Sequence, residues 1–308
     1  MVEAPALPEG VHQMSTVAPQ REQSVNNAIR EISHIATLPE ITVKVVELVE
    51  DAKSTAQDLH KVISGDPALC SRILKVVNSS FYGLPGQIGS INRAIVMLGL
   101  NAVKNIAIAA SLAKLFRGGD LTPSFSARDL WTHSNVTAAA AKVIAHSLKL
   151  GFSDEAFLAG LVHDIGIMIE MQYDRNKLTE VIRRTGADSK GVPACDMLEA
   201  ELAVFEATHQ DFGAGLCEKW KFPKSFTYVT GHHHNPTGLP PELRTLTSVI
   251  YVADRLAAET GMGFRLDLLT TEVSAEVLDT LKLSSERLAE IRTQVAATAK
   301  DAASVLGG

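Results

Sequence analysis

A histidine and an aspartate stand side by side, as His163 and Asp164, within the otherwise apolar segment LAGLVHDIGIMIE at 158–170. On a regular helix, Asp164 would lie about 20° from Phe157 and therefore inside the apolar arc, whereas His163 would lie about 120° away. Burying an ionised carboxylate costs on the order of several kcal/mol unless a cation, a metal ion or dedicated hydrogen bonds compensate it. The two side chains can therefore act at one place only if the helix bends or if their partners approach from two sides.

Further histidines and aspartates follow along the second half of the chain. Three consecutive histidines, His232, His233 and His234, precede a Pro and a Gly. Asp254 is an aspartate among apolar helical neighbours. His133 follows Asp129 by one helical turn, and His209 is expected to open a helix. Neutral imidazoles and carboxylates bind iron, manganese or zinc, so these residue types indicate a metal site. Alternatively, a His-Asp pair is an ordinary surface pair or helix cap.

The segments that carry these residues are predicted to be helical. Apolar residues recur at helical spacing from Ala28 onward, and Ser54 with Gln57 predicts a capping box. Asp66-Pro67 marks another helix start, while GGDLTPS at 118–124 is the clearest break. No segment alternates like a β-strand, so the chain is predicted to be all-α. The helices expected after the break cover 126–149, 153–172, 196–208, 242–260 and the chain from about 284.

Composition narrows the class of protein. The 308 residues are 46% hydrophobic, which is enough to bury a core. A net charge of −6, with no block of lysines or arginines, gives no reason to expect binding to nucleic acid or to a membrane. The N-terminal sequence lacks the features of a signal peptide, and no apolar run is long enough to span a bilayer. We therefore expect a cytoplasmic protein.

The order of the candidate residues resembles the HD superfamily of metal-dependent phosphohydrolases. Several further motifs resemble the HDOD family, a bacterial signalling relative of those enzymes. In chain order they are LPE at 38–40, DPAL at 66–69, ILKVVNSSFYG at 73–83, INRAIVMLG at 91–99, LWTHS at 130–134, GLVHDIG at 160–166 and WKFPKSF leading into GHHHNP at 220–236. The resemblance spans roughly residues 28–260. It implies a flexible leader at 1–27, an N-terminal helical lobe at 28–120, and an HD-like helical bundle with a C-terminal helix at 121–308.

The resemblance also implies a ligand set, carried over position by position. The W-x-F-P motif aligns the family's histidine pair with His233 and His234, with His232 as a possible substitute. Asp129 matches a further acidic ligand of some cyclic-dinucleotide phosphodiesterases, although an exposed acid in a first helical turn is at least as good an interpretation. The implied ligands of one or two divalent ions (iron, manganese or zinc) are His133, His163, Asp164, His209, two of His232, His233 and His234, and Asp254. If the site is active, His163 and Asp164 are its catalytic residues.

One departure bears on activity. Ile167 stands where the cyclic-dinucleotide enzymes usually have a lysine, and 237–240 is only an abbreviated form of their Gly-Tyr-Pro stretch. The cations that can replace the lysine are Lys221, Lys224, Arg244 and Arg255. The expected function is therefore a bacterial regulatory module that binds a signalling protein or a nucleotide-like small ligand. The alternative is an active phosphohydrolase acting on a nucleotide or phosphodiester, and a third interpretation makes the histidines structural, with no metal.

Overall fold

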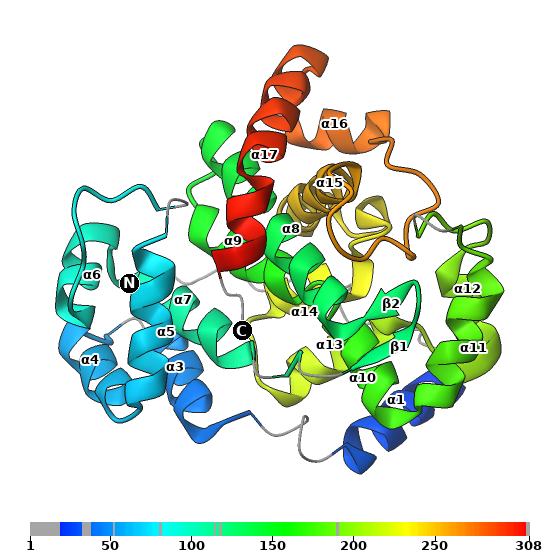
Figure 1. Ribbon diagram of the computed structural model, residues 1–308, viewed down its shortest axis with the longest axis horizontal. Helices are drawn as coiled ribbons and strands as arrows, with labels where there is room; N and C mark the ends of the chain where they lie inside the picture. Colours follow the sequence, from blue (N-terminus) through cyan, green and yellow to red (C-terminus); the bar gives the residue numbers. More distant parts are fainter. Residues whose placement is uncertain are drawn as a thin grey trace, which may run out of the picture.

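The computed structural model describes residues 19–32, 38–51, 53–79, 82–113, 115–116, 119–188 and 191–305 (Figure 1). Helices make up most of these residues, which confirms the all-α prediction. The expectation that no strand forms is wrong at one place, where β1 (Asp120–Thr122) pairs antiparallel with β2 (Phe125–Ser126). This small hairpin falls in the predicted break. Its last residue, Ser126, accepts a hydrogen bond from the backbone of Asp129 and so begins the next helix.

Five helices form the group on the left of Figure 1, which we call the first lobe. Asp66 caps its third helix and Pro67 takes the first helical position, as predicted. The capping box lies one residue later than predicted, because Thr55 and Asp58 form it. The helices are α3 (Glu40–Glu50), α4 (Ala56–Ser64), α5 (Pro67–Val77), α6 (Ile91–Leu98) and α7 (Leu100–Leu112).

The second lobe is built around α8 (Ala127–Ser147), which packs against α9, α15 and α17. The lobes share one continuous hydrophobic core, and α7 packs directly on α9. The amphipathic α11 and the short α16 were not predicted. The remaining elements are α9 (Ser153–Val162), α10 (Ile165–Tyr173), α11 (Arg175–Thr185), α12 (Met197–Phe205), α13 (His209–Lys219), α14 (Lys224–His232), η2 (Pro236–Gly238), η3 (Pro241–Leu243), α15 (Thr245–Glu259), α16 (Ala275–Leu281) and α17 (Ser285–Val305).

Helix α1 (Pro19–Glu31) corrects the predicted leader, because residues 19–27 are helical and part of the packed structure. The first eighteen residues of that leader lie outside the described part of the chain. Val25 and Ile29 are buried against Gly215 of α13, where a Cβ atom would lie 2.6 Å from Val25 Cγ1. Although α1 precedes the first lobe in sequence, it therefore packs on α13 and α10 of the second lobe (Figure 1).

The predicted continuous helix over 153–172 is interrupted between α9 and α10. The interruption comprises His163 and Asp164, and Asp164 leaves helical geometry with φ −97° and ψ 16°. Glycines flank it on both sides. A Cβ at Gly160 would lie 2.9 Å from the backbone of Ala138 in α8, and one at Gly166 would lie 1.8 Å from the carbonyl oxygen of His209. The two glycines thus let α8 and α13 approach the His-Asp pair from two sides.

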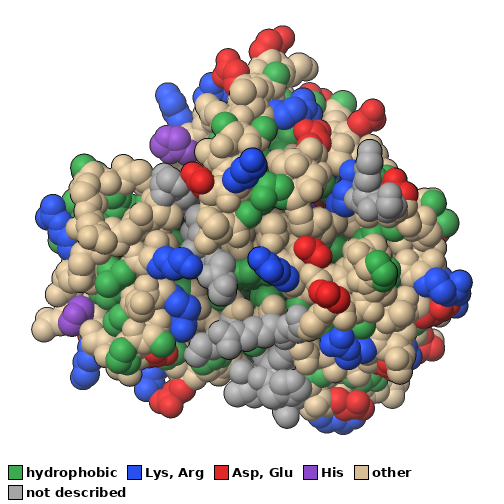
Figure 2. Space-filling view, in the orientation of Figure 1, with side chains coloured by type: hydrophobic (Ala, Val, Ile, Leu, Met, Phe, Trp, Pro, Cys, Tyr) green, Lys and Arg blue, Asp and Glu red, His purple; other side chains and the backbone are tan. Residues whose placement is uncertain are grey.

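The described surface is consistent with the mixed charge of the sequence. On the face drawn in Figure 2, basic and acidic side chains are interspersed and no extended basic patch is visible. Within the described part of the chain, every helix is too short or too polar to cross a lipid bilayer.

Substituting Gly166 tests the close approach of α10 and α13. We expect Gly166→Ala to lower the free energy of unfolding by about 3 kcal/mol or more, because its Cβ would overlap the backbone of His209. Denaturant unfolding measures this. Gly89→Ala is the matched control, since a Cβ there meets nothing within 4 Å, and it should change stability by less than about 0.5 kcal/mol. Equal stability of the two variants would contradict the close packing.

Candidate metal centre

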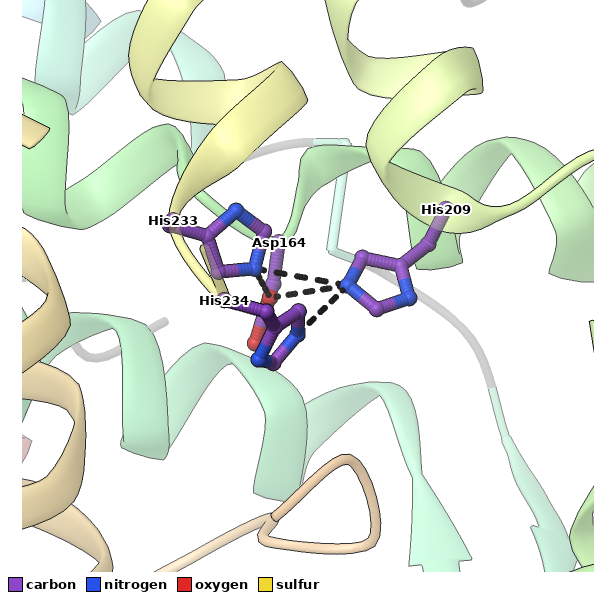
Figure 3. A group of neighbouring side chains, drawn as sticks. All are labelled: Asp164, His209, His233 and His234. Carbon is purple, nitrogen blue, oxygen red and sulfur yellow. Dashed lines mark hydrogen bonds and ion pairs between the residues drawn. The ribbon is translucent and has the colours of Figure 1, made fainter. Parts of the chain in front are cut away.

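The interruption between α9 and α10 lies where four other helices meet. His133 comes from α8, His209 is the first residue of α13, and Asp254 lies in α15. His233 and His234 come from the end of α14 (Figure 3). Apart from His234, whose side chain is 8% exposed, the side chains of the cluster are fully buried. The structure therefore brings together all the predicted ligands except His232, which belongs to none of the groups that can hold a metal ion.

Asp164 lies at the middle of the cluster and faces imidazoles with both of its oxygens. Oδ1 is 3.2 Å from Nε2 of His233 and 3.8 Å from Nε2 of His209. Oδ2 is 3.2 Å from Nε2 of His163 and 3.8 Å from Nε2 of His133. Figure 3 shows the carboxylate between His209, His233 and His234. A carboxylate with imidazoles facing both of its oxygens could supply a ligand atom to each of two groups of histidines.

Two ligand sets consequently share Asp164. The first contains His133, His163 and Asp164. Asp254 extends it, because its Oδ1 lies 3.0 Å from Nε2 of His133 and 3.8 Å from Nε2 of His163. The second set contains Asp164 with the three histidines His209, His233 and His234. Each set offers the mixture of nitrogen and oxygen donors that iron, manganese and zinc accept.

Hydrogen bonds fix which nitrogen of the histidines carries the proton. Nδ1 of His163 donates to the carbonyl oxygen of Gly160 at 2.7 Å, and Nδ1 of His233 lies 3.2 Å from the carbonyl of Val229. A carbonyl can only accept, so each Nδ1 is protonated and, in the neutral ring, each Nε2 carries a lone pair. Those Nε2 atoms all point into the cluster. Nε2 of His209 is 3.3 Å from Nε2 of His233, a contact between lone pairs that a cation would convert into coordination.

The charges of the cluster are unbalanced without an ion. Neither carboxylate oxygen of Asp164 or Asp254 accepts a hydrogen bond from the described residues. Burial lowers the pKa of His209 and His233, so both are neutral. Burial also opposes protonation of His163, but Asp164 and Asp254 outweigh it and hold the pKa of His163 well above its usual value. The two aspartates therefore favour a positive charge at this position, and without a metal ion a proton on His163 supplies it. A site that favours a positive charge among these donors fits a metal ion.

Glu201, which the sequence analysis did not identify, orients His209. Its two oxygens accept hydrogen bonds from Nδ1 of His209 at 2.8 Å and from the backbone N–H of His209 at 2.9 Å. Glu170 is buried nearby, and burial together with the charge of Glu201 raises the pKa of Glu170 well above its usual value. Burial raises the pKa of Glu201 as well, whereas the hydrogen bond from the backbone N–H of His209 lowers it. The two hydrogen bonds from His209 hold the oxygens of Glu201 beside this ring and fix its orientation as a ligand.

Other candidates from the sequence lie outside the cluster. Asp129 is exposed and accepts a hydrogen bond from the Ser126 hydroxyl at 2.7 Å, so it belongs to the cap of α8. Lys221 and Lys224 are exposed. Arg244 donates to the carbonyls of Thr237 and Leu239.

Arg255 is the closest of the four candidate cations, with Nη1 3.9 Å from Oδ2 of Asp254. Its guanidinium also stacks on Tyr251, 3.4 Å from the ring centroid, and donates to the carbonyls of Tyr251 and Glu272. Two of its five N–H groups are therefore used away from the cluster. Asp267, in contrast, was missed by the sequence analysis and lies beside His234 and Asp254.

An all-helical fold around a buried His/Asp cluster that can hold metal ions defines the class of this protein. A family model for the HDOD domain matches residues 35–236, and the chain belongs to the HDOD family. Among curated proteins, an uncharacterized protein of Treponema pallidum (strain Nichols) is 24% identical over 231 residues. That match covers 72% of this chain but only 42% of the relative, so this chain spans less than half of the relative's length.

Solved structures show the same fold. An HDOD domain protein of unknown function from Geobacter sulfurreducens has a TM-score of 0.77 at 20% identity, covering 92% of this chain and 97% of that one. A proposed phosphohydrolase from Shewanella amazonensis SB2B has a TM-score of 0.72 at 19% identity, covering 94% and 100%. A proposed signal transduction protein from Marinobacter aquaeolei VT8 has a TM-score of 0.74 at 21% identity, covering 94% and 66%.

Removing the bridging carboxylate tests the metal centre. We expect wild-type protein purified without chelator to contain iron, manganese or zinc, and Asp164→Ala to lose it, because Asp164 belongs to both ligand sets. Elemental analysis by mass spectrometry measures the content. Asp129→Ala removes an exposed aspartate that caps α8 and should keep the metal. Metal-free wild-type protein that also fails to take up added metal would contradict the site.

The orienting role of Glu201 predicts a weaker effect. Glu201→Gln should lower metal affinity by about 10- to 100-fold, because a neutral amide no longer strengthens His209 as a ligand. Competition with a chromogenic chelator measures the affinity. Glu199→Gln is the matched control, since Glu199 is an exposed residue of the same helix. An unchanged affinity in Glu201→Gln would exclude the role.

Proposed function

We propose that this chain is a metal-containing regulatory module of bacterial signalling, which works in the cytoplasm by binding a signalling protein or a nucleotide-like small ligand. Its membership of the HDOD family supports the signalling role. The observation that carries the proposal is the burial of an intact ligand set. The cluster retains every type of ligand that the HD enzymes use, yet its side chains are inaccessible to solvent apart from the edge of His234.

Two features disfavour turnover of a phosphodiester. Ile167 occupies the expected lysine position and is fully buried, so no cation projects from that turn. Phe264, in the loop between α15 and α16, lies with its ring centroid 6.2 Å from that of His133 and covers this side of the first ligand set. On this side, a phosphate group would have to displace Phe264 before it reached the first ligand set.

The second candidate is a metal-dependent phosphohydrolase, and the geometry of Asp164 favours it. Divalent ions held by these residues would supply Lewis acidity and an activated water for attack on phosphorus. In that case Asp164 would hold the ions together while His163, beside it, would complete the first ligand set. The proposal and this candidate share the same metal centre and differ only in whether a substrate enters it.

A hydrolysis assay separates the two functions. We expect metal-loaded wild-type protein to cleave bis(p-nitrophenyl) phosphate and cyclic dinucleotides no faster than Asp164→Ala, because the site is closed and lacks the lysine. Chromatography of the nucleotides and absorbance of nitrophenolate measure the rates. Turnover that requires loaded metal and disappears in Asp164→Ala would replace the regulatory proposal with the phosphohydrolase.

A further inference from the structure

The loop between α15 and α16 brings one more carboxylate to the cluster, from Asp267. This residue lies beyond residues 35–236, which the family model matches. Its Oδ2 is 3.5 Å from Nε2 of His234, and its side chain is fully buried. Ligand atoms of His234, Asp254 and Asp267 all lie within 4.8 Å of one another. We propose that Asp267 is a further metal ligand, which binds the ion held by His234; this inference rests on the metal centre of the proposed function.

The loop is anchored so that Asp267 has a defined position. Gly263 has φ +82°, and a Cβ there would lie 2.5 Å from the carbonyl oxygen of Asp129. The next residue, Phe264, donates its backbone N–H to that same carbonyl at 3.1 Å. Leu266 and Leu268 are buried on either side of Asp267. The contacts of Gly263, Phe264 and the two leucines hold the backbone of the loop in place, so the carboxylate of Asp267 stays beside His234.

The carboxylate of Asp267 lacks partners that would explain its burial otherwise. Neither oxygen accepts a hydrogen bond from the described residues. The charged groups that act on it most strongly are the aspartates Asp164 and Asp254, whose charges repel it, and His163. An unpaired carboxylate beside two others is a large electrostatic cost in a buried site. A divalent cation next to His234 removes that cost for all three aspartates.

The charge count favours the same assignment. Two divalent ions bring four positive charges, and Asp164 with Asp254 would neutralise only half of them. Asp254 lies 3.0 Å from Nε2 of His133 and also has a ligand atom within 4.8 Å of His234, so it is placed between the two sides, whereas Asp267 is grouped with His234 and not with His133 or His163. Asp267 therefore supplies a carboxylate that belongs to the His234 side alone. Its removal should therefore affect one ion more than the other.

The amide variant Asp267→Asn distinguishes a ligand from a residue that merely orients His234. Asparagine keeps an oxygen that can accept a hydrogen bond from His234, but it loses the charge that binds a cation. Asparagine has nearly the same shape as aspartic acid, and the substitution removes no hydrogen bond to another described residue, so loss of folding is not expected. Glu272→Gln is the matched control, because Glu272 is an exposed residue of the same loop.

The experiment is a zinc titration of chelator-treated, dialysed protein, followed by elemental analysis and calorimetry. We expect wild type and Glu272→Gln to bind about two zinc ions per chain. Asp267→Asn should lose about one of them or bind it at least about tenfold more weakly. Identical stoichiometry and affinity in Asp267→Asn and wild type would overturn the ligand role while leaving the metal centre intact. Absence of zinc binding in wild type would instead overturn the proposed function and, with it, this inference.

Discussion

The convergence of imidazole lone pairs and carboxylate oxygens in a buried space is the interaction on which the rest of the structure depends. Protons on Nδ1 of His163 and His233 are committed to backbone carbonyls, so Nε2 of each ring can only accept as long as the ring is neutral. No described group donates to Asp164 or Asp254 in return. A bound cation would replace these repulsions with coordination bonds. Binding of such a cation would add to the folding free energy of the second lobe, because the candidate ligands come from α8, α13, α14 and α15 as well as from the α9–α10 junction.

The interruption between α9 and α10 follows from the same requirement. Adjacent residues on a helix point about 100° apart, so a continuous helix could not direct both His163 and Asp164 at one centre. Ending α9 at Val162 and starting α10 at Ile165 removes this restriction. This arrangement requires glycine at positions 160 and 166, because a side chain at Gly160 or Gly166 would prevent α8 or α13 from contacting the interruption. The interruption of the helix and the two glycines are therefore both required for His163 and Asp164 to face the same cluster.

The sequence predicted those parts of the structure that leave a periodic or motif signal. The apolar spacing predicted most helices, and the position of Asp164 in an apolar arc predicted that it needed a partner. Helix α1 was missed because its apolar face comprises only Val25, Ala28 and Ile29 in a polar segment. Glu201 and Asp267 were missed for another reason. Glu201 is important because it contacts His209, which follows it after the turn at the end of α12. Asp267 is important because it contacts His234, which lies far from it in the sequence.

Helix α9 links the metal centre to the first lobe. It packs along α7 of that lobe and along α8, and its C-terminal end leads directly into His163 and Asp164. A ligand or partner can shift a protein between states only through a difference in its free energy of binding to each state. An ion bound by Asp164 and the histidines of α13 and α14 would contact the end of α9, whereas a partner bound to the first lobe would reach the side of α9 through α7. If the two lobes communicate, α9 is the element on which both influences act.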